Sequence, residues 1–296
     1  MNINKLNDYE DKVNQFEQTF GPIPISVNYS IRNEPSRVPH KKWVINNETD
    51  KAIDIVGVNF PPFSHPEFFY PAGATVIEGL GVEDTRGAQC KWRTARNNAW
   101  VMFDVMLPNV RVRIETAKHS TEVAQRIIML HGIDGSCSNQ VFYGGIESFC
   151  TNGQIEGDYA KVRRKNTSKF SMPNFVEELR QAKENFHTHG KRMQKWAETS
   201  VATSKVEAML KALLKSDRKT EKMMSLYRTE TSVRGQNMYA LYSAFTNYST
   251  YADERNGFTL RQTGNDTSAI SMWRREQDVS KWVSSQEFKA LELQAA

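Results

Sequence analysis

The chain has 296 residues, and its 39% hydrophobic content is enough for a sizeable core in one large domain or two ordinary ones. Lys and Arg outnumber Asp and Glu by 39 to 34, and the resulting net charge of +5 favours contact with nucleic acid or another acidic surface. No apolar stretch reaches the length of a membrane span, and the charged N-terminus lacks the apolar segment of a secretory signal, so we expect a soluble, cytoplasmic protein without a membrane partner.

Cofactor and metal signatures are missing from the sequence. Cys90, Cys137 and Cys150 are odd in number and form no C-x-x-C pair, which indicates reduced thiols. His187 and His189 have no acid or cysteine at ligand spacing, so we expect no metal site there. Neither a GxxxxGK[ST] loop nor a G-x-G-x-x-G loop occurs. We therefore expect no cofactor.

The first sixty residues predict a helix, an extended arm and a hairpin. Apolar residues at helical spacing predict an amphipathic helix that ends at Gly21-Pro22. An extended segment with a short strand near Ile25–Ile31 follows, because prolines break any longer element. The β-branched runs Lys42–Ile45 and Ala52–Val58 flank a turn-rich loop and predict a β-hairpin.

The middle of the chain predicts an antiparallel sheet. Its strands are expected at Ala74–Val82, Ala88–Arg93, Trp100–Leu107, Val110–Ile114, Ile127–Leu130 and Val141–Phe149. We expect Pro108-Asn109 to separate two of them, and His131–Ser136 to form a turn.

The character of the chain becomes helical after Pro173. Asn174 is the expected N-cap of the first helix, and further helices are predicted at Val201–Leu214, Lys219–Arg228, Asn237–Asp253 and Ser285–Leu293, whereas Asn265 to Trp282 looks polar and turn-rich. The fold class is thus α+β, an N-terminal antiparallel β-sheet followed by a helical C-terminal half. We divide the chain into an N-terminal helix and arm (1–40), a β-rich core (41–172) and a helical region that packs on the core (173–296).

Basic residues gather on or beside the predicted strands Ala88–Arg93 and Val110–Ile114 and in a burst at Lys161–Lys169, and aromatic residues lie near them. Alternation across Tyr159–Lys165 predicts a strand that carries charge on an exposed face. Alternation places charged and aliphatic side chains on opposite faces of the later strands. Taken alone, each cluster suits a solvated outer face, whereas together they favour a groove for an anionic polymer. The candidate nucleic-acid-binding residues are Lys91, Trp92, Arg93, Arg96, Trp100, Arg111, Arg113, Tyr159, Lys161, Arg163, Arg164, Lys165 and Lys169.

Enzyme signatures are weak. His131, Asp134, Ser136 and Cys137 include the residue types of a nucleophilic triad, but neighbours in one turn usually point apart. The acidic pair Glu177-Glu178 is explained by the positive end of a helix dipole. Four aromatic residues, Tyr239, Tyr242, Phe245 and Tyr248, recur along one predicted helix and indicate a core stripe rather than a base-stacking platform.

Three parts of the sequence, taken in order, resemble the family known as domain of unknown function 932, which is borne by phages and plasmids. They are Lys42–Ile45 with Ile55–Pro62, His131–Ser138 with Phe149–Gly153, and Met238–Tyr248. The resemblance implies a phage or mobile-element origin. The order of sheet and then helices is also similar to that of single-strand annealing recombinases of the RAD type, which hold DNA in a basic groove without ATP.

From these features we predict a non-enzymatic protein that binds single-stranded DNA and promotes annealing in recombination as a homo-oligomer. The alternative is a phage structural or host-interaction protein that does not bind nucleic acid. Amphipathic segments at both ends and a Met-rich run around Met209, Met223 and Met224 support that alternative. A third hypothesis is an enzyme, such as a nuclease, whose site residues are scattered along the sequence.

Overall fold

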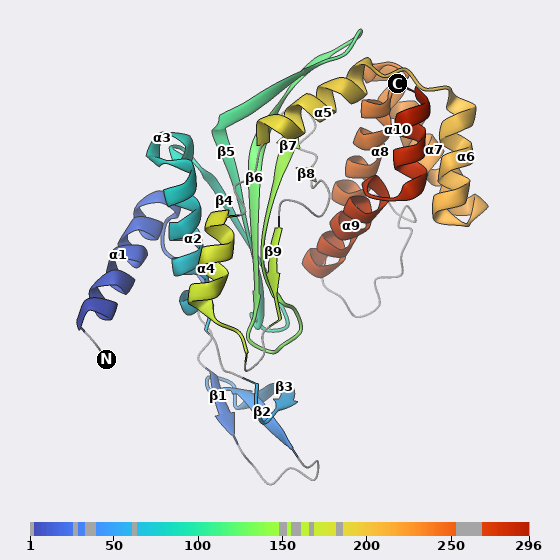
Figure 1. Cartoon of the computed structure of the whole chain (residues 1–296). Helices are drawn as coiled ribbons and strands as arrows, with labels where there is room; N and C mark the ends of the chain where they lie inside the picture. Colours follow the sequence, from blue (N-terminus) through green and yellow to red (C-terminus); the bar gives the residue numbers. More distant parts are fainter. Residues whose placement is uncertain are drawn as a thin grey trace. The chain divides into compact units, whose positions relative to one another are not determined.

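The computed structural model describes residues 3–25, 29–32, 40–60, 64–147, 153–154, 161–165, 169–181, 186–252 and 268–295 (Figure 1). It divides into two units, each made of several chain segments. Unit 1 comprises 1–109, 127–142 and 161–183, and unit 2 comprises 110–126, 143–160 and 184–296. Helices and antiparallel strands occur together, which confirms the predicted α+β class. The division at residues 40 and 172 stays a prediction.

The first sheet, in unit 1, contains the predicted hairpin. Its strands are β1 (Tyr29–Arg32), β2 (Lys41–Asn46) and β3 (Lys51–Gly57), and both pairings are antiparallel. The Oδ1 atom of Asn46 accepts hydrogen bonds from the backbone N–H groups of Glu48 and Thr49. These bonds fix the turn between β2 and β3.

The second sheet has the order β4-β5-β6-β7-β8, and β9 also pairs with β7. Its strands are β4 (Gln89–Ala95), β5 (Trp100–Glu115), β6 (Ser120–Gly132), β7 (Asn139–Glu147), β8 (Gly153–Gln154) and β9 (Lys161–Arg164). The strands β5, β6 and β7 each contribute residues to both units.

The predicted break at Pro108-Asn109 is wrong, because β5 runs through these residues as one strand. The pairing of β4 with β5 ends at Gln89 and Met106, so Pro108 lies beyond the last pair on that side. A proline, which has no N–H to donate, is tolerated at such a position. The Asn109 side chain donates to the backbone oxygens of Glu83 and Arg86.

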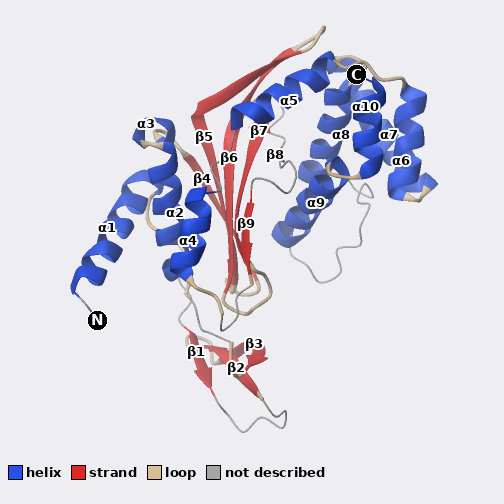
Figure 2. Ribbon diagram, in the orientation of Figure 1, coloured by secondary structure: helices blue, strands red, loops and turns tan. Residues whose placement is uncertain are grey.

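Helices of unit 1 cover one face of its strands (Figure 2). They are α1 (Ile3–Phe20), α2 (His65–Leu80), α3 (Val82–Thr85) and α4 (Met172–Gln181). Phe103 of β5 packs against Phe20 of α1 and Phe69 of α2, and Phe68 of α2 packs against Phe175 of α4. This aromatic layer joins the three long helices to the sheet. The N-terminal helix is confirmed.

The predicted strand Ala74–Val82 is wrong, because α2 covers most of it. The helix begins with a capping box, in which the Ser64 Oγ accepts from the Glu67 N–H and the Glu67 carboxylate accepts from the Ser64 N–H. Residues 71–77 are all buried. The sequence therefore lacks the polar residues at helical spacing by which a surface helix is identified.

Unit 2 contains the helices α5 (Phe186–Glu198), α6 (Thr203–Leu214), α7 (Asp217–Arg234), α8 (Met238–Tyr251), α9 (Ser268–Val283) and α10 (Gln286–Ala295). The helix α8 is almost wholly buried, and its four predicted aromatic residues lie in the hydrophobic core, which confirms the core stripe. The residues of the Met-rich run, Met209, Met223 and Met224, are buried in the same core and so offer no adaptable surface.

The polar segment predicted at Asn265 to Trp282 is wrong over its described part, which forms α9. Arg275 and Glu276 are buried in this helix among Trp273 and Val279. The Arg275 Nε donates to the backbone oxygen of Ser249, and Glu276 pairs with a buried arginine of β6. Because charged residues occupy buried positions of α9, its sequence does not show the apolar helical periodicity that predicts a helix. No helix in the described ranges is long and apolar enough to cross a membrane.

Candidate nucleic-acid interface

The predicted binding residues are divided between the units. Arg111 and Arg113 belong to unit 2, as does Tyr159, which lies outside the described residues. The others belong to unit 1, where the side chain of Lys161 is not described. The candidate interface is therefore built within unit 1.

The strand β4 presents charged residues on one face and Trp92 on the other, as alternation requires. The Arg93 Nη1 lies 2.8 Å from the Asp104 Oδ2, so its charge is neutralised within the sheet. Lys91 is exposed and lies opposite Asp104 in the register. The Trp92 ring stacks on Phe103 with ring centroids 4.0 Å apart. This ring is part of the aromatic layer of unit 1.

The turn after β4 holds Arg96 against an acid as well. The Arg96 Nη1 lies 3.3 Å from the Oδ2 of Asp134, whose side chain is fully buried. Trp100, at the start of β5, is only 3% exposed. Its ring lies in the core, where it cannot stack on a base without a rearrangement.

The two arginines of unit 2 lie on the exposed side of β5, as predicted from alternation. Arg111 pairs with Glu122 at 2.7 Å, and Arg113 pairs with Glu115 at 3.0 Å. The Arg113 Nε also donates to the Ser120 Oγ. Both guanidinium groups are engaged by neighbours on the same hairpin.

The strand β9 carries its two arginines on opposite faces. Arg163 is the register partner of Gln140, and Arg164 is the partner of Asn139. The Arg163 Nε donates to the Ser138 Oγ at 3.3 Å and has no acidic partner among the described residues. Arg164 projects toward α4. The basic residues predicted on this strand therefore lie on both faces of β9 and do not form one surface.

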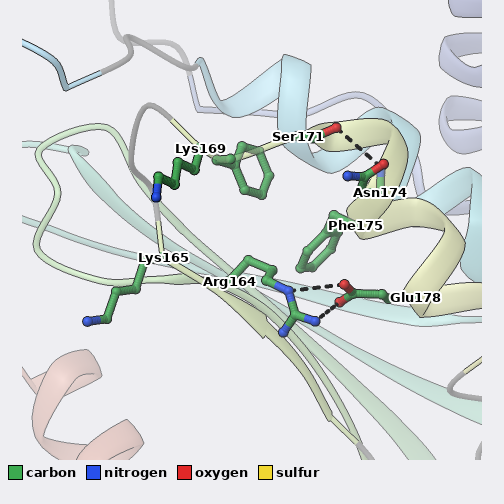
Figure 3. A pocket seen from close by; sticks show the side chains of 8 residues that line it. Arg164, Lys165, Lys169, Ser171, Asn174, Phe175 and Glu178 are labelled. Atoms are coloured by element: carbon green, nitrogen blue, oxygen red, sulfur yellow. Dashed lines mark hydrogen bonds and ion pairs between the residues drawn. The ribbon is translucent and has the colours of Figure 1, made fainter.

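A pocket of about 260 Å³ lies between the end of β9 and the start of α4 (Figure 3). It is lined by Arg164, Lys165, Lys169, Phe170, Ser171, Asn174, Phe175 and Glu178. Lys165 and Lys169 are exposed, and neither has an ion-pair partner in the part of the chain that is described. Three cations and one carboxylate give this lining an excess of positive charge.

The Arg164 guanidinium is held on two sides. Its Nε donates to the Glu178 Oε1 at 3.1 Å, and its Nη2 lies 2.5 Å from the Glu178 Oε2. Its Nη1 donates to the backbone oxygen of Arg163 at 2.8 Å. Figure 3 shows this bidentate pair at one side of the pocket and the ammonium groups of Lys165 and Lys169 at the other.

The N-cap predicted at Asn174 is wrong, because α4 begins at Met172. The Ser171 Oγ accepts from the Asn174 N–H at 3.4 Å, so Ser171 takes the role of cap. Phe175, on the first turn, packs against Phe170 in a tilted arrangement with ring centroids 6.0 Å apart. Phe170 is half-buried, and it is the aromatic ring that this pocket offers to a ligand.

Five lining residues were not predicted as site residues from the sequence: Phe170, Ser171, Asn174, Phe175 and Glu178. The signal was their spacing, because Ser171, Asn174 and Glu178 recur at the intervals of one helical face directly after a basic strand. From the sequence, Glu178 is explained by its favourable interaction with the helix dipole, and its ion pair with Arg164 was therefore not predicted.

The loop residues considered for nucleophilic chemistry have structural partners. The Nδ1 atoms of His65 and His131 lie 2.7 Å apart, and the His65 Nε2 lies 2.8 Å from the backbone oxygen of Asn98. Burial lowers the pKa of His65 to about 4 and that of His131 well below its ordinary value. Burial and the nearby Asp134 raise the pKa of the Cys137 thiol, which disfavours a thiolate nucleophile.

Metal binding is not indicated by the arrangement of ligating side chains. In the described ranges, no group of three or more His, Cys, Asp or Glu residues is placed to hold a metal ion. On α5, His189 is buried whereas His187 is exposed, so the two rings do not share a site.

Comparison with known proteins gives one match. The family model described as domain of unknown function (DUF932) matches residues 73–286, which is well over half of the chain. No curated protein and no solved structure gave a match. The matched segment contains all of the long β5–β7 strands, β9 and the pocket, together with α5 to α9. The chain therefore belongs to the DUF932 family.

Proposed function

We propose that unit 1 binds single-stranded DNA through the surface around the β9–α4 pocket. The observation that carries this proposal is the gathering of Arg164, Lys165 and Lys169 around a concave site that also contains an aromatic ring. Cations that follow the phosphates, combined with rings on which bases stack, are the recurring elements of single-strand binding surfaces.

The predicted basic clusters differ in how many of their cations have an acidic partner, and this difference favours the surface around the pocket. Arg93, Arg96, Arg111 and Arg113 each have an acidic partner at 2.7–3.3 Å, so their charges are largely compensated. Lys165 and Lys169 have no such partner among the residues that the structure describes. Uncompensated cations release condensed counterions from DNA, and this release supplies most of the affinity.

The aromatic component also differs from the prediction. Trp100 belongs to the packed interior of unit 1, and Trp92 is half-buried with its ring stacked on Phe103. Phe170 is half-buried beside the two lysines and offers a ring to an unpaired base. Stacking of this kind requires a base free of its partner strand, which favours single-stranded over duplex DNA.

We propose further that binding is non-catalytic and promotes annealing by a homo-oligomer of a phage-encoded or mobile-element protein. The support is the resemblance of the sheet-then-helix order to the annealing recombinases of the RAD type, together with a site that contains cations and a ring. This proposal needs no nucleotide-hydrolysis motif, and the sequence carries none of the known loops.

The experiment is a titration of a labelled oligothymidine with the full chain across a salt series. Changing Lys165 and Lys169 together to alanine should lower affinity and reduce the salt slope by about 0.7 for each lost phosphate contact. The matched control changes Lys205 and Lys219 of unit 2, two exposed lysines outside the pocket, and should leave both quantities nearly unchanged. Absence of oligonucleotide binding by the wild-type protein at low salt would overturn the proposal and favour the protein-interaction alternative.

A further inference from the structure

Glu178 holds the Arg164 guanidinium at one side of the pocket. Its two carboxylate oxygens engage the Nε and Nη2 atoms of Arg164 along one edge of the guanidinium. Carboxylate and phosphate groups both bind this edge in a bidentate manner, with two parallel N–H···O bonds. The carboxylate therefore has the geometry of an internal substitute for a phosphate.

We propose that Glu178 is an internal competitor, and that a phosphate group of the bound strand replaces it on Arg164. This inference rests on the proposed function and names the phosphate site within it. The ligand chemistry is a phosphate of a nucleotide, bound by Arg164 in a pocket that Lys165 and Lys169 also line. Glu178 lowers the affinity of any ligand that must replace it on Arg164.

Energetics permit the exchange. The Arg164 and Glu178 side chains are 53% and 34% exposed, so their ion pair lies close to water. Such pairs contribute only about 0–1 kcal/mol, which a ligand can replace. The second contact of Arg164, from Nη1 to the Arg163 backbone oxygen, holds the guanidinium in place while the partner changes.

The positions of the lysines favour the phosphate over the carboxylate. Figure 3 shows both ammonium groups on the side of the pocket away from Glu178. A phosphate that replaces Glu178 on Arg164 would lie across the pocket from the two lysines, whose positive charge favours an anion there. At about 260 Å³, the pocket is smaller than the roughly 300–1,000 Å³ of sites that enclose whole drug-sized ligands. One phosphate with its attached sugar or base suits this space.

The test is a double-mutant cycle on oligothymidine affinity. Glu178→Gln should tighten binding about two- to fivefold, because a competitor worth up to about 1 kcal/mol is removed. Glu177→Gln is the control, since it makes the same charge change one residue away, where the carboxylate pairs with Arg180 and does not line the pocket. In an Arg164→Ala background the gain from Glu178→Gln should vanish.

A second probe separates this inference from the proposed function. Inorganic pyrophosphate should bind the wild-type chain weakly and the Glu178→Gln variant more tightly, as measured by calorimetry. Equal gains for Glu177→Gln and Glu178→Gln, or a gain that persists without Arg164, would overturn the competitor and leave DNA binding intact. Pyrophosphate binding with the expected cycle but no oligonucleotide binding would support the phosphate site and overturn the DNA function. Binding of neither probe would overturn both.

Discussion

Gly73 of α2 lies directly against the ring of Phe16 in α1. A Cβ atom added at this position would lie 2.3 Å from the Cδ2 atom of Phe16, a distance that real contacts do not reach. Phe16 is fully buried and packs against Tyr70 and Phe103, so its ring has no room to move. The same helix also contains Gly79, where no atom lies within 4 Å of an added Cβ.

These two glycines provide a matched pair of substitutions in one helix. Gly73→Ala should destabilise the protein by about 1–3 kcal/mol, because overpacking at Phe16 exceeds the gain in helix propensity. Gly79→Ala should stabilise it by roughly 0.5–1 kcal/mol. Urea denaturation measures both changes. Stabilisation of similar size at both positions would show that α1 does not pack closely on α2.

Residue types alone predicted part of the candidate site. Lys165 and Lys169 lie in a basic run whose chemistry is evident from the sequence. The compensation of Arg93 and Arg96 was not evident, because their acids come from other parts of the chain: Asp104 from β5 and Asp134 from the turn after β6. A count of cations along a sequence therefore overestimates the charge that is free to meet a polyanion.

At the scale of elements, the sequence predicts those whose pattern reflects a single buried face. The hairpin of β2 and β3 has β-branched runs around a polar turn and was found as expected. The sequence of α2 contains a recognisable capping box at Ser64 and Glu67. Its central residues are buried on all sides, so the sequence shows no polar face and no helical periodicity. The helix α9 was not predicted for the opposite reason: charged residues occupy buried positions, so the sequence shows no apolar face.

A buried ionic network joins β7 to α7 within unit 2. Arg234, which is almost fully buried, places its Nη2 2.5 Å from the Glu147 Oε1 and pairs through its Nη1 with Glu230. Asn247 of α8 donates to the Glu230 Oε1 at 2.8 Å. One guanidinium thus bridges two buried carboxylates contributed by a strand and a helix.

Removal of the bridging cation should cost far more than neutralisation of one acid. Arg234→Met leaves two buried carboxylates without the bridging cation, and we expect a loss of about 3–5 kcal/mol in the free energy of unfolding. Glu147→Gln keeps an acceptor oxygen for Arg234 and the pair with Glu230, so its cost should be nearer 1 kcal/mol. Equal costs in urea denaturation would show that the network does not act as a bridge.

At the scale of the whole molecule, the division into units follows no boundary along the sequence. The strands β5, β6 and β7 pass from one unit to the other after Asn109, Arg126 and Phe142. Because three strands contribute residues to both units, neither unit is one continuous segment of the chain. The order of sheet and helices was predictable, whereas this exchange of segments depends on contacts between residues far apart in the sequence.

Buried histidines in both units couple folding to pH. Burial lowers the pKa of His65 to about 4 and that of His189 to about 3, and it lowers the pKa of His131 as well. In the unfolded chain these groups return to about 6.5. Between pH 6.5 and 4 the unfolded state therefore binds more protons than the folded state, and stability is lost as the pH falls.

For unit 1, the pair of His65 and His131 should make the free energy of unfolding fall by up to roughly 3 kcal/mol per pH unit below pH 6.5. Urea denaturation at several pH values measures this slope. His131→Phe keeps a ring against Phe68 and removes one titrating group, so it should flatten the slope by about 1.4 kcal/mol per unit. His187→Gln, at an exposed position of α5, should leave the slope unchanged. Because the slope is a difference in bound protons, it separates the titration of His131 from any loss of packing, which would lower stability equally at every pH. A variant with reduced stability but the wild-type slope would show that these buried rings are not the groups that take up protons on unfolding.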